Sequence, residues 1–231
     1  MLKKQAVDIV KKRGPKPKGK VDIKWSSNFA YAIGLIATDG CLSKDGRHID
    51  LTSKDKEQLL NYCRALKIDT KITYKFSGAG KKYGRIQFGD VLFYNFLLSI
   101  GLTSSKSKTI PKLKIPSVYY FDFIRGCFDG DGCFYSYFDP RWKSSFMFYV
   151  AFVSASKDFI DWMRKENKKY CGVVGHLSKD GGGSTYQLKY AKKESLELIR
   201  KMYYNNQVIC LSRKKKKILK ALKINKIAQV L

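Results

Sequence analysis

Two aspartates, Asp39 and Asp131, stand at the same place in two stretches of the chain that share one pattern. Residues 32–40 and residues 124–132 are each an apolar run with an internal glycine that ends in Asp-Gly, followed by Cys and a large apolar residue. An internal repeat indicates two similar halves, and a pseudo-twofold axis between the halves brings equivalent side chains to one place. Two carboxylates meeting there repel each other unless cations lie between them. The pattern therefore predicts a metal site.

Mg²⁺ suits such a site because it prefers an octahedral shell of carboxylates, waters and substrate phosphates. Metals held in this way can activate water and stabilise a leaving 3′ oxygen. The glycines inside the two stretches, Gly34 and Gly126, would let two helices approach backbone to backbone. The alternative is that each aspartate only caps a helix or binds turn amides, as Asp-Gly often does. Asp129 has Ala37 as its counterpart, so we expect it to be structural.

The charge of the chain indicates its partner. Lys and Arg number 46 against 19 acidic residues, a net charge of +27. The first 24 residues account for +7, so the remainder keeps +20. Such an excess is expected of a protein that neutralises the phosphates of nucleic acid. A ribosome-type RNA binder and a protein bound to acidic lipid are the alternatives, whereas 44% hydrophobic residues argue against global disorder.

Composition also bears on location. No stretch approaches the roughly 20 apolar residues of a membrane span, and the N-terminus lacks the pattern of a signal peptide. The six cysteines contain no Cys-x-x-Cys, which excludes the usual zinc patterns and a disulfide framework. We expect reduced thiols, an intracellular reducing compartment such as the cytoplasm, nucleoid or an organelle matrix, and no membrane association.

Residues 1–24 are expected to form a basic, flexible N-terminal arm. Residues 13–20 resemble an imperfect AT-hook, the Gly/Pro/Arg strip that lies in a narrow minor groove. A phosphate-binding arm is the favoured interpretation.

Two halves follow, residues 25–116 and 117–231, each with the predicted order α-β-β-α-β-β-α. Hydrophobic periodicity and turn residues predict the first half as helix 26–38, a hairpin over 42–53, helix 54–67, strands 70–77 and 83–89, and helix 90–100. They predict the second half as helix 117–130, strands 133–138 and 146–154, a helix from Ser156, strands 172–178 and 184–190, helix 192–204, and a basic helix from 212. Aligning Ser-Lys-Asp at 53–55 with Ser-Lys-Asp at 156–158 makes the second hairpin longer by 11 residues.

With this order in place, the two nonapeptides resemble the paired signature of the LAGLIDADG homing endonucleases, in their single-chain, two-motif form. The resemblance covers residues from about 25 to 222. It implies an α+β fold in which two pseudo-twofold-related αββαββα halves form a saddle-shaped antiparallel β-sheet over DNA.

The resemblance also implies a site. Asp39 and Asp131 would bind metal, helped by the carbonyls of Thr38 and Gly130. A basic residue just after the last helix of each half completes the pocket in the family, and the matching residues here are Lys106 and Lys214, with Lys108 and Arg213 as register alternatives. Some relatives place a glutamine near the end of the second strand, where this sequence has Ser53 and Ser156.

Alternation along the strands separates a core face from a polar face. Ile72, Tyr74 and Phe76 are expected to face the core, as are Ile86 and Phe88 of the next strand. Lys, Arg and Gln on the polar face are residue types that bond purine edges in the major groove. The expected DNA-contacting residues are Lys44, His48, Asp50, Lys71, Thr73, Lys75, Arg85 and Gln87 in the first half, and Tyr135, Tyr137, Arg141, Lys143, Gln187 and Lys189 in the second.

The expected function is metal-dependent, site-specific cleavage of both strands of duplex DNA. The resemblance implies a long asymmetric target, short 3′ overhangs and a monomeric protein. We expect Mg²⁺ as cofactor, Mn²⁺ as a substitute, and Ca²⁺ to support binding without efficient cleavage. The alternative is a non-cleaving binder on the same scaffold, either an RNA-splicing maturase or a transcription regulator. An intein-borne nuclease would need a terminal His-Asn pair and splicing blocks, which are absent from the sequence.

Overall fold

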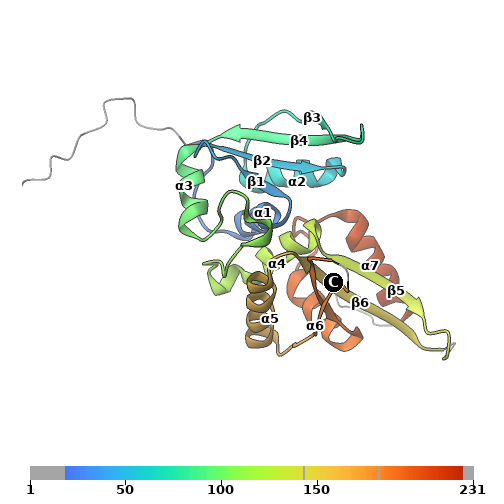
Figure 1. The fold of residues 1–231 in the computed structure, drawn as a ribbon. Helices are drawn as coiled ribbons and strands as arrows, with labels where there is room; N and C mark the ends of the chain where they lie inside the picture. The colour runs from blue at the N-terminus through green and yellow to red at the C-terminus, as the bar shows by residue number, and fades with distance from the viewer. Residues whose placement is uncertain (1–18, 143, 182, 226–231) are drawn as a thin grey trace, which may run out of the picture.

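The computed structural model describes residues 19–225, apart from 143 and 182. These residues form two halves, each with a four-stranded antiparallel sheet, and two helices meet between the sheets (Figure 1). The predicted α+β class and the twofold repetition of elements are confirmed. Within the described ranges, no helix combines the length and apolar character needed to cross a bilayer.

The first half contains the first sheet, in the order β1-β2-β4-β3. Its elements are α1 (Ser27–Thr38), β1 (Gly40–Leu42), β2 (His48–Ser53), α2 (Lys56–Leu66), β3 (Thr73–Phe76), β4 (Lys82–Gly89), α3 (Val91–Ser99) and a 3₁₀ turn, η1 (Lys106–Lys108).

The second half repeats this arrangement around the second sheet, in the order β5-β6-β8-β7. Its elements are η2 (Ser117–Tyr119), α4 (Tyr120–Gly130), β5 (Cys133–Phe138), β6 (Phe146–Ser154), α5 (Lys157–Cys171), β7 (His176–Lys179), β8 (Tyr186–Tyr190), α6 (Lys192–Met202) and α7 (Ser212–Ile224). Helix α7 lies alongside β5, the outer strand of this sheet (Figure 1).

The contact between α1 and α4 joins the two halves. Residues 29–37 of α1 are all buried, which is expected of a helix surrounded by protein on every side. A Cβ on Gly34 would lie 2.9 Å from the Cα of Gly126, and a Cβ on Gly126 would lie 3.0 Å from the Cα of Gly34. Both would also collide with backbone carbonyls of the opposite helix, those of Phe123 and Tyr31. Only glycine allows this approach.

The two halves align differently from the predicted Ser-Lys-Asp match. Ser53 and Ser154 both end a strand, and each side chain accepts a hydrogen bond from the N–H two residues later. The next residues to cap a helix are Asp55, whose side chain accepts from Glu57, and Ser156, whose side chain accepts from Phe159. Ser53 therefore corresponds to Ser154 rather than Ser156, and the second hairpin is longer by nine residues, not 11. The expectation was wrong because the tripeptide ends at the helix cap, Asp55, in the first half but begins at the cap, Ser156, in the second.

The core face of β3 is also not as expected. Tyr74 and Phe76 are 58% and 68% exposed, so they are not buried in the core. The reason is that β3 is an edge strand, and α2, which covers the inner face of this sheet, contacts β2 and β4. Ile72, which precedes the strand, does pack against the core.

The predicted N-terminal arm, residues 1–24, lies mostly outside the described residues. Its described part is attached to the first half, because the backbone N–H groups of Lys20 and Val21 both donate to the carboxylate of Asp90, at 2.6 and 3.0 Å. Asp90 also caps α3, and Val21 is buried. Residues 20 and 21 are therefore fixed against the first half.

The glycine contact gives a prediction about stability. Gly126→Ala should lower the free energy of unfolding by about 1–3 kcal/mol, because the added methyl group must push two helix backbones apart. Urea denaturation would measure the change. The matched control is Gly78→Ala in an exposed turn, where a Cβ meets no atom within 4 Å. If both variants unfolded like the wild type, the close approach of α1 and α4 would be refuted.

Candidate active site at the helix junction

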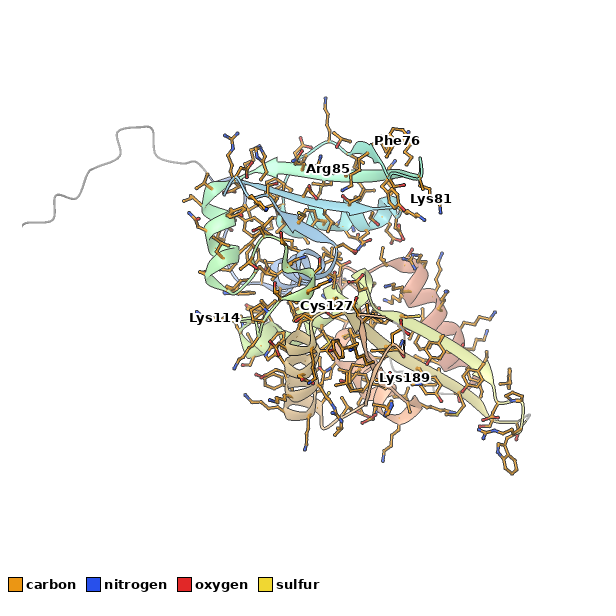
Figure 2. All side chains as sticks on the ribbon, viewed as in Figure 1. Phe76, Lys81, Arg85, Lys114, Cys127 and Lys189 are labelled. Carbon is orange, nitrogen blue, oxygen red and sulfur yellow. The ribbon has the colours of Figure 1, made fainter. Side chains whose placement is uncertain are left out.

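The two motif aspartates follow directly on the two helices that meet at the junction. Asp39 is the C-cap of α1 and Asp131 is the C-cap of α4. The Asp39 Oδ2 atom lies 3.0 Å from the position that a Cβ on Gly130 would occupy, so the Asp39 carboxylate rests against the end of the opposite helix. Figure 2 shows the junction at Cys127, one turn before Asp131. The structure thus brings the predicted pair together.

Asp131 opens onto a hollow of about 430 Å³ that both halves line. Thr38 and Ser107 come from the first half, while Val153, Ser154 and Thr185 come from the second. The hollow is therefore a feature of the paired halves and not of either one alone.

The electrostatics of the two aspartates show that this position is costly for negative charge. Burial, and next to it the neighbouring charge of Asp131, raise the pKa of Asp39 to about 6, although the hydrogen bond from Gln58 and the charges of Lys214 and Lys106 oppose the rise. Burial also raises the pKa of Asp131, against the lowering effects of Lys106 and Lys214. A cation between the carboxylates would relieve this cost.

Lys106 is the basic residue on the first-half side. It lies in η1, is 5% exposed, and its ammonium group donates to the carbonyl of Gly40 at 2.6 Å. Burial lowers the pKa of Lys106, while the charges of Cys41, Asp131 and Asp39 raise it. The register alternative, Lys108, is exposed.

Lys214 occupies the equivalent place in the second half. Its ammonium group faces the carbonyl oxygens at the end of α4 and just beyond: Phe128, Asp129 at 2.9 Å, Gly130 at 3.2 Å and Gly132 at 2.6 Å. A cation is favoured at a helix C-terminus, where carbonyls have no partner of their own. Burial lowers the pKa of Lys214 to about 8, which still leaves it largely charged at pH 7. The alternative, Arg213, points away and pairs with Asp55 at 2.7 Å.

Each lysine segment is anchored on the opposite half. The Ser156 hydroxyl at the start of α5 donates to the carbonyl of Ile110, which follows Lys106, at 2.6 Å. On the other side, Glu57 of α2 accepts from the backbone and hydroxyl of Ser212, at 3.0 and 2.8 Å. The pocket lysines are therefore positioned by contacts that exist only when the halves are joined.

Gln58 is a site residue that the sequence did not single out. Its side-chain amide donates to Asp39 Oδ2 at 2.5 Å, and its carbonyl accepts from the Ser53 hydroxyl at 2.6 Å, which fixes the direction of the amide. Gln58 is 4% exposed on the inner side of α2. The expected position for a glutamine was the strand end, where Ser53 stands. The signal available in the sequence was a glutamine on the apolar side of the first turn of an amphipathic helix. By the corrected alignment, Phe159 stands in the second half at the position that Gln58 has in the first.

The donor set fits a divalent cation. The part of the chain described contains no group of three or more His, Cys, Asp and Glu side chains that could enclose a metal. Two carboxylates with free space beside them are the kind of site in which Mg²⁺ keeps several waters and takes substrate phosphates as ligands. The Gly130 carbonyl oxygen accepts from Lys214 at 3.2 Å, and its second lone pair could bind the cation. The Thr38 hydroxyl bonds back to Gly34 and Leu35 within α1.

Asp129 points in a different direction from Asp131. It is 1% exposed, and its Oδ2 atom accepts from the Tyr31 hydroxyl at 2.8 Å and from the Leu211 N–H at 2.7 Å. It therefore ties α4 to α1 and to the segment before α7. This geometry agrees with the structural role expected of it.

The polar face of the first sheet carries most of the residues expected to contact DNA. On neighbouring strands, Thr73 lies opposite Arg85, and Asp50 lies opposite Gln87. Lys75 and Gln87 are exposed, Lys71 lies in the loop before β3, and Lys44 lies in the β1–β2 turn. His48, the first residue of β2, is held by Asp45 of that turn. Asp50 differs from the expectation, because it is only 6% exposed and bonds Arg85 instead of standing free.

The corresponding face of the second sheet is aromatic. Tyr149 stacks on Tyr135 and Tyr137 with ring centroids 5.1 and 6.1 Å away, and the Lys189 ammonium lies 5.3 Å from the Tyr149 ring. Gln187 is half-buried on this face, and Figure 2 shows Lys189 on the second sheet and Arg85 on the first. Arg141 is exposed in the turn beyond and pairs with Asp139. Lys143 lies outside the described residues. Tyr149 is a further residue of this face, and its signal in the sequence is the alternation with the buried Phe148 and Val150.

The comparisons place this architecture among known folds. No family model and no curated protein matches the sequence. Solved structures do match. The LAGLIDADG meganuclease I-AabMI, bound to uncleaved DNA, is 14% identical with a TM-score of 0.58 over 87% of this chain and 91% of that chain. The homing endonuclease I-WcaI, bound to its DNA recognition sequence, is 14% identical with a TM-score of 0.57, over 84% and 86%.

The fold also occurs in the N-terminal LAGLIDADG domain of DUF199/WhiA, which is 17% identical with a TM-score of 0.53, over 85% of this chain and 88% of that chain. The resemblance drawn from the two motifs is thus confirmed as a similarity of fold: the chain has the LAGLIDADG fold. At these identities the fold alone does not decide what the protein does.

The raised pKa of Asp39 predicts how stability depends on pH in metal-free buffer. The native pKa, about 6, exceeds the usual value of 3.8, so the folded state favours the protonated carboxyl. The stability gained is full below pH 4 and is lost as the pH rises through 6. Asp39→Asn cannot ionise there. Its stability relative to the wild type should therefore improve by about 2 kcal/mol between pH 4.5 and 7.5, as measured by urea unfolding in EDTA. A pH-independent difference would refute the assignment.

Proposed function

We propose that this protein is a metal-dependent DNA endonuclease that cuts both strands of a duplex at a specific site. The observation that carries the proposal is the convergence of Asp39 and Asp131, from two halves, at one junction with a buried lysine on each side. The cost of holding two carboxylates there is expected where a cation binds.

Each residue of the proposed site has its own role. Asp39 and Asp131 would hold Mg²⁺ or Mn²⁺, each facing one strand across the minor groove. When the cation is bound, the chemistry supplied is activation of a water and stabilisation of the leaving 3′ oxygen. Gln58 orients the Asp39 carboxylate through its fixed amide. Lys106 and Lys214 supply positive charge next to the scissile phosphates and hold the ends of the two helices in place.

DNA is the proposed partner because the polar faces of the two sheets carry Lys, Arg, Gln and Tyr side chains on a chain of net charge +27. The two faces differ in composition, so the preferred target should be asymmetric. One chain holds both aspartates, so a monomer suffices for cleavage of both strands. Short 3′ overhangs remain an expectation from the family resemblance.

A non-cleaving nucleic-acid binder is the second candidate, favoured by one observation: the same fold occurs in DUF199/WhiA as well as in endonucleases. Such a protein would not need two carboxylates at the junction or the buried lysines beside them. Both are present here, so we favour the nuclease. An RNA-splicing maturase would share the scaffold and would bind RNA in preference to duplex DNA.

The motif aspartates separate the two candidates. Asp131→Asn and Asp39→Asn should each lower the rate of cleavage by several orders of magnitude, because the amide keeps the shape of the side chain but cannot hold the cation. Binding of duplex DNA should survive. Cleavage and gel-shift affinity would be measured on a site selected from a randomised library.

The control for these variants is Asp180→Asn, which removes a carboxylate from the exposed turn between β7 and β8. It should cut at the wild-type rate. Wild-type cleavage by either motif variant would mean that the aspartates are helix caps, and the binding protein would become the better account.

The metal requirement gives a separate prediction. Mg²⁺ and Mn²⁺ should support both binding and cleavage, whereas Ca²⁺ should support binding with little cleavage, because it accepts looser geometry and more ligands. The rate of cutting would be followed in each metal and in EDTA. Full activity in EDTA would contradict a metal-dependent mechanism.

A further inference from the structure

Asp50 and Arg85 form an ion pair on the polar face of the first sheet that the proposed chemistry does not use. The Arg85 guanidinium donates to the Asp50 carboxylate at 2.6 Å. We infer that this pair recognises one guanine in the first half-site, an inference that rests on the proposed duplex binding. Arg85 is the specificity-determining residue, and Asp50 is the positioning residue that holds Arg85 in place before DNA binds.

The position of Asp50 requires an explanation. It is a carboxylate of which 6% is exposed, on the face of a strongly basic protein that is expected to meet phosphate. A negative charge there opposes DNA binding unless it serves another group. Arg85 is its hydrogen-bonded partner, and removing either partner would leave a poorly hydrated charge. We conclude that Asp50 is present to hold Arg85.

Arg85 is held in place, but not all of its hydrogen-bond donors have a partner. It lies in the middle of the sheet, between Thr52 on β2 and Thr73 on β3. Its Nε atom and the Thr52 hydroxyl oxygen are both buried without a hydrogen-bond partner. Buried polar atoms are almost always paired, so these two atoms show that the protein alone does not satisfy the hydrogen-bonding capacity around Arg85. The side chain of Arg85 is 29% exposed, which leaves it accessible to such a ligand.

The chemistry of a held guanidinium selects the ligand. Arginine presents a planar fork of donors, and a pair of acceptors at the spacing of guanine O6 and N7 matches it in the major groove. Phosphate would also accept from arginine, but the carboxylate of Asp50 beside the guanidinium repels a second anion. A neutral base edge with two acceptors is therefore favoured over the backbone.

The second half has no equivalent of the Asp50–Arg85 ion pair at the matching positions. By the corrected alignment, Ala151 stands in place of Asp50, Gln187 in place of Arg85, and Val153 in place of Thr52. The tyrosines of the second sheet lie around these positions. The preset guanine contact therefore belongs to one half-site only, which gives the target a defined orientation.

The experiment measures base preference at each position of the target by competitive binding of a randomised duplex library in Ca²⁺. The wild type should show one position in the first half-site where guanine is preferred by about 10–100-fold. Arg85→Lys and Arg85→Gln should abolish that preference. Asp50→Asn should reduce it to a few-fold while leaving the average affinity for the library at or above the wild-type value.

The matched control is Lys75→Ala, an exposed cation on the same face, which should weaken binding to every sequence alike and reduce the salt dependence. Urea unfolding of each variant identifies those that fail to fold. If Asp50→Asn does not fold, the two Arg85 variants, which keep Asp50, still test the guanine preference.

The inference is overturned if no guanine preference depends on Arg85, or if Asp50→Asn keeps the full preference. These outcomes leave the proposed function intact when the wild type still binds and cuts DNA. If the wild type binds no duplex at all, both the proposed function and this inference fail.

Discussion

The contact between α1 and α4 is the constraint on which the rest of the structure depends. Gly34 and Gly126 allow the two helix backbones to touch, and the Cβ of any other residue at either position would meet backbone atoms of the opposite helix. Because each helix ends a fixed distance after its glycine, the touching helices deliver Asp39 and Asp131 to the same place. The site is thus a consequence of how the halves are joined, since neither half could assemble it alone.

The anchoring of the pocket lysines follows the same logic. Lys106 and Lys214 lie next to the motif of their own half, but their segments are held by Ser156 and Glu57 of the opposite half. Asp129 adds a buried tie between α4, Tyr31 and Leu211. Loss of contact at the junction would therefore displace carboxylates and lysines together, so the stability of the junction and the competence of the site are coupled.

The paired helices and most of the secondary structure could be predicted from the sequence, because both halves carry the same short-range patterns. The spacing of Gly34 and Asp39, matched by Gly126 and Asp131, predicted the junction, and helix caps and turn glycines predicted nearly every element. Contacts that depend on the third dimension were not accessible. Gln58 reaches Asp39 from a different helix, Tyr74 and Phe76 are exposed on an edge strand, and the buried Asp50 bonds Arg85 of the neighbouring strand. Short shared sequences also misled, as the tripeptides at 53 and 156 did.

The central claim is that Asp39 and Asp131 jointly hold divalent metal at the junction when DNA is bound. The most direct measurement is anomalous X-ray diffraction from crystals of the protein with its selected duplex and Mn²⁺. The account predicts anomalous peaks at the junction within about 2.0–2.2 Å of oxygens of both aspartates and of the DNA phosphates. Absence of such peaks, with both carboxylates bonded instead to backbone amides, would contradict it.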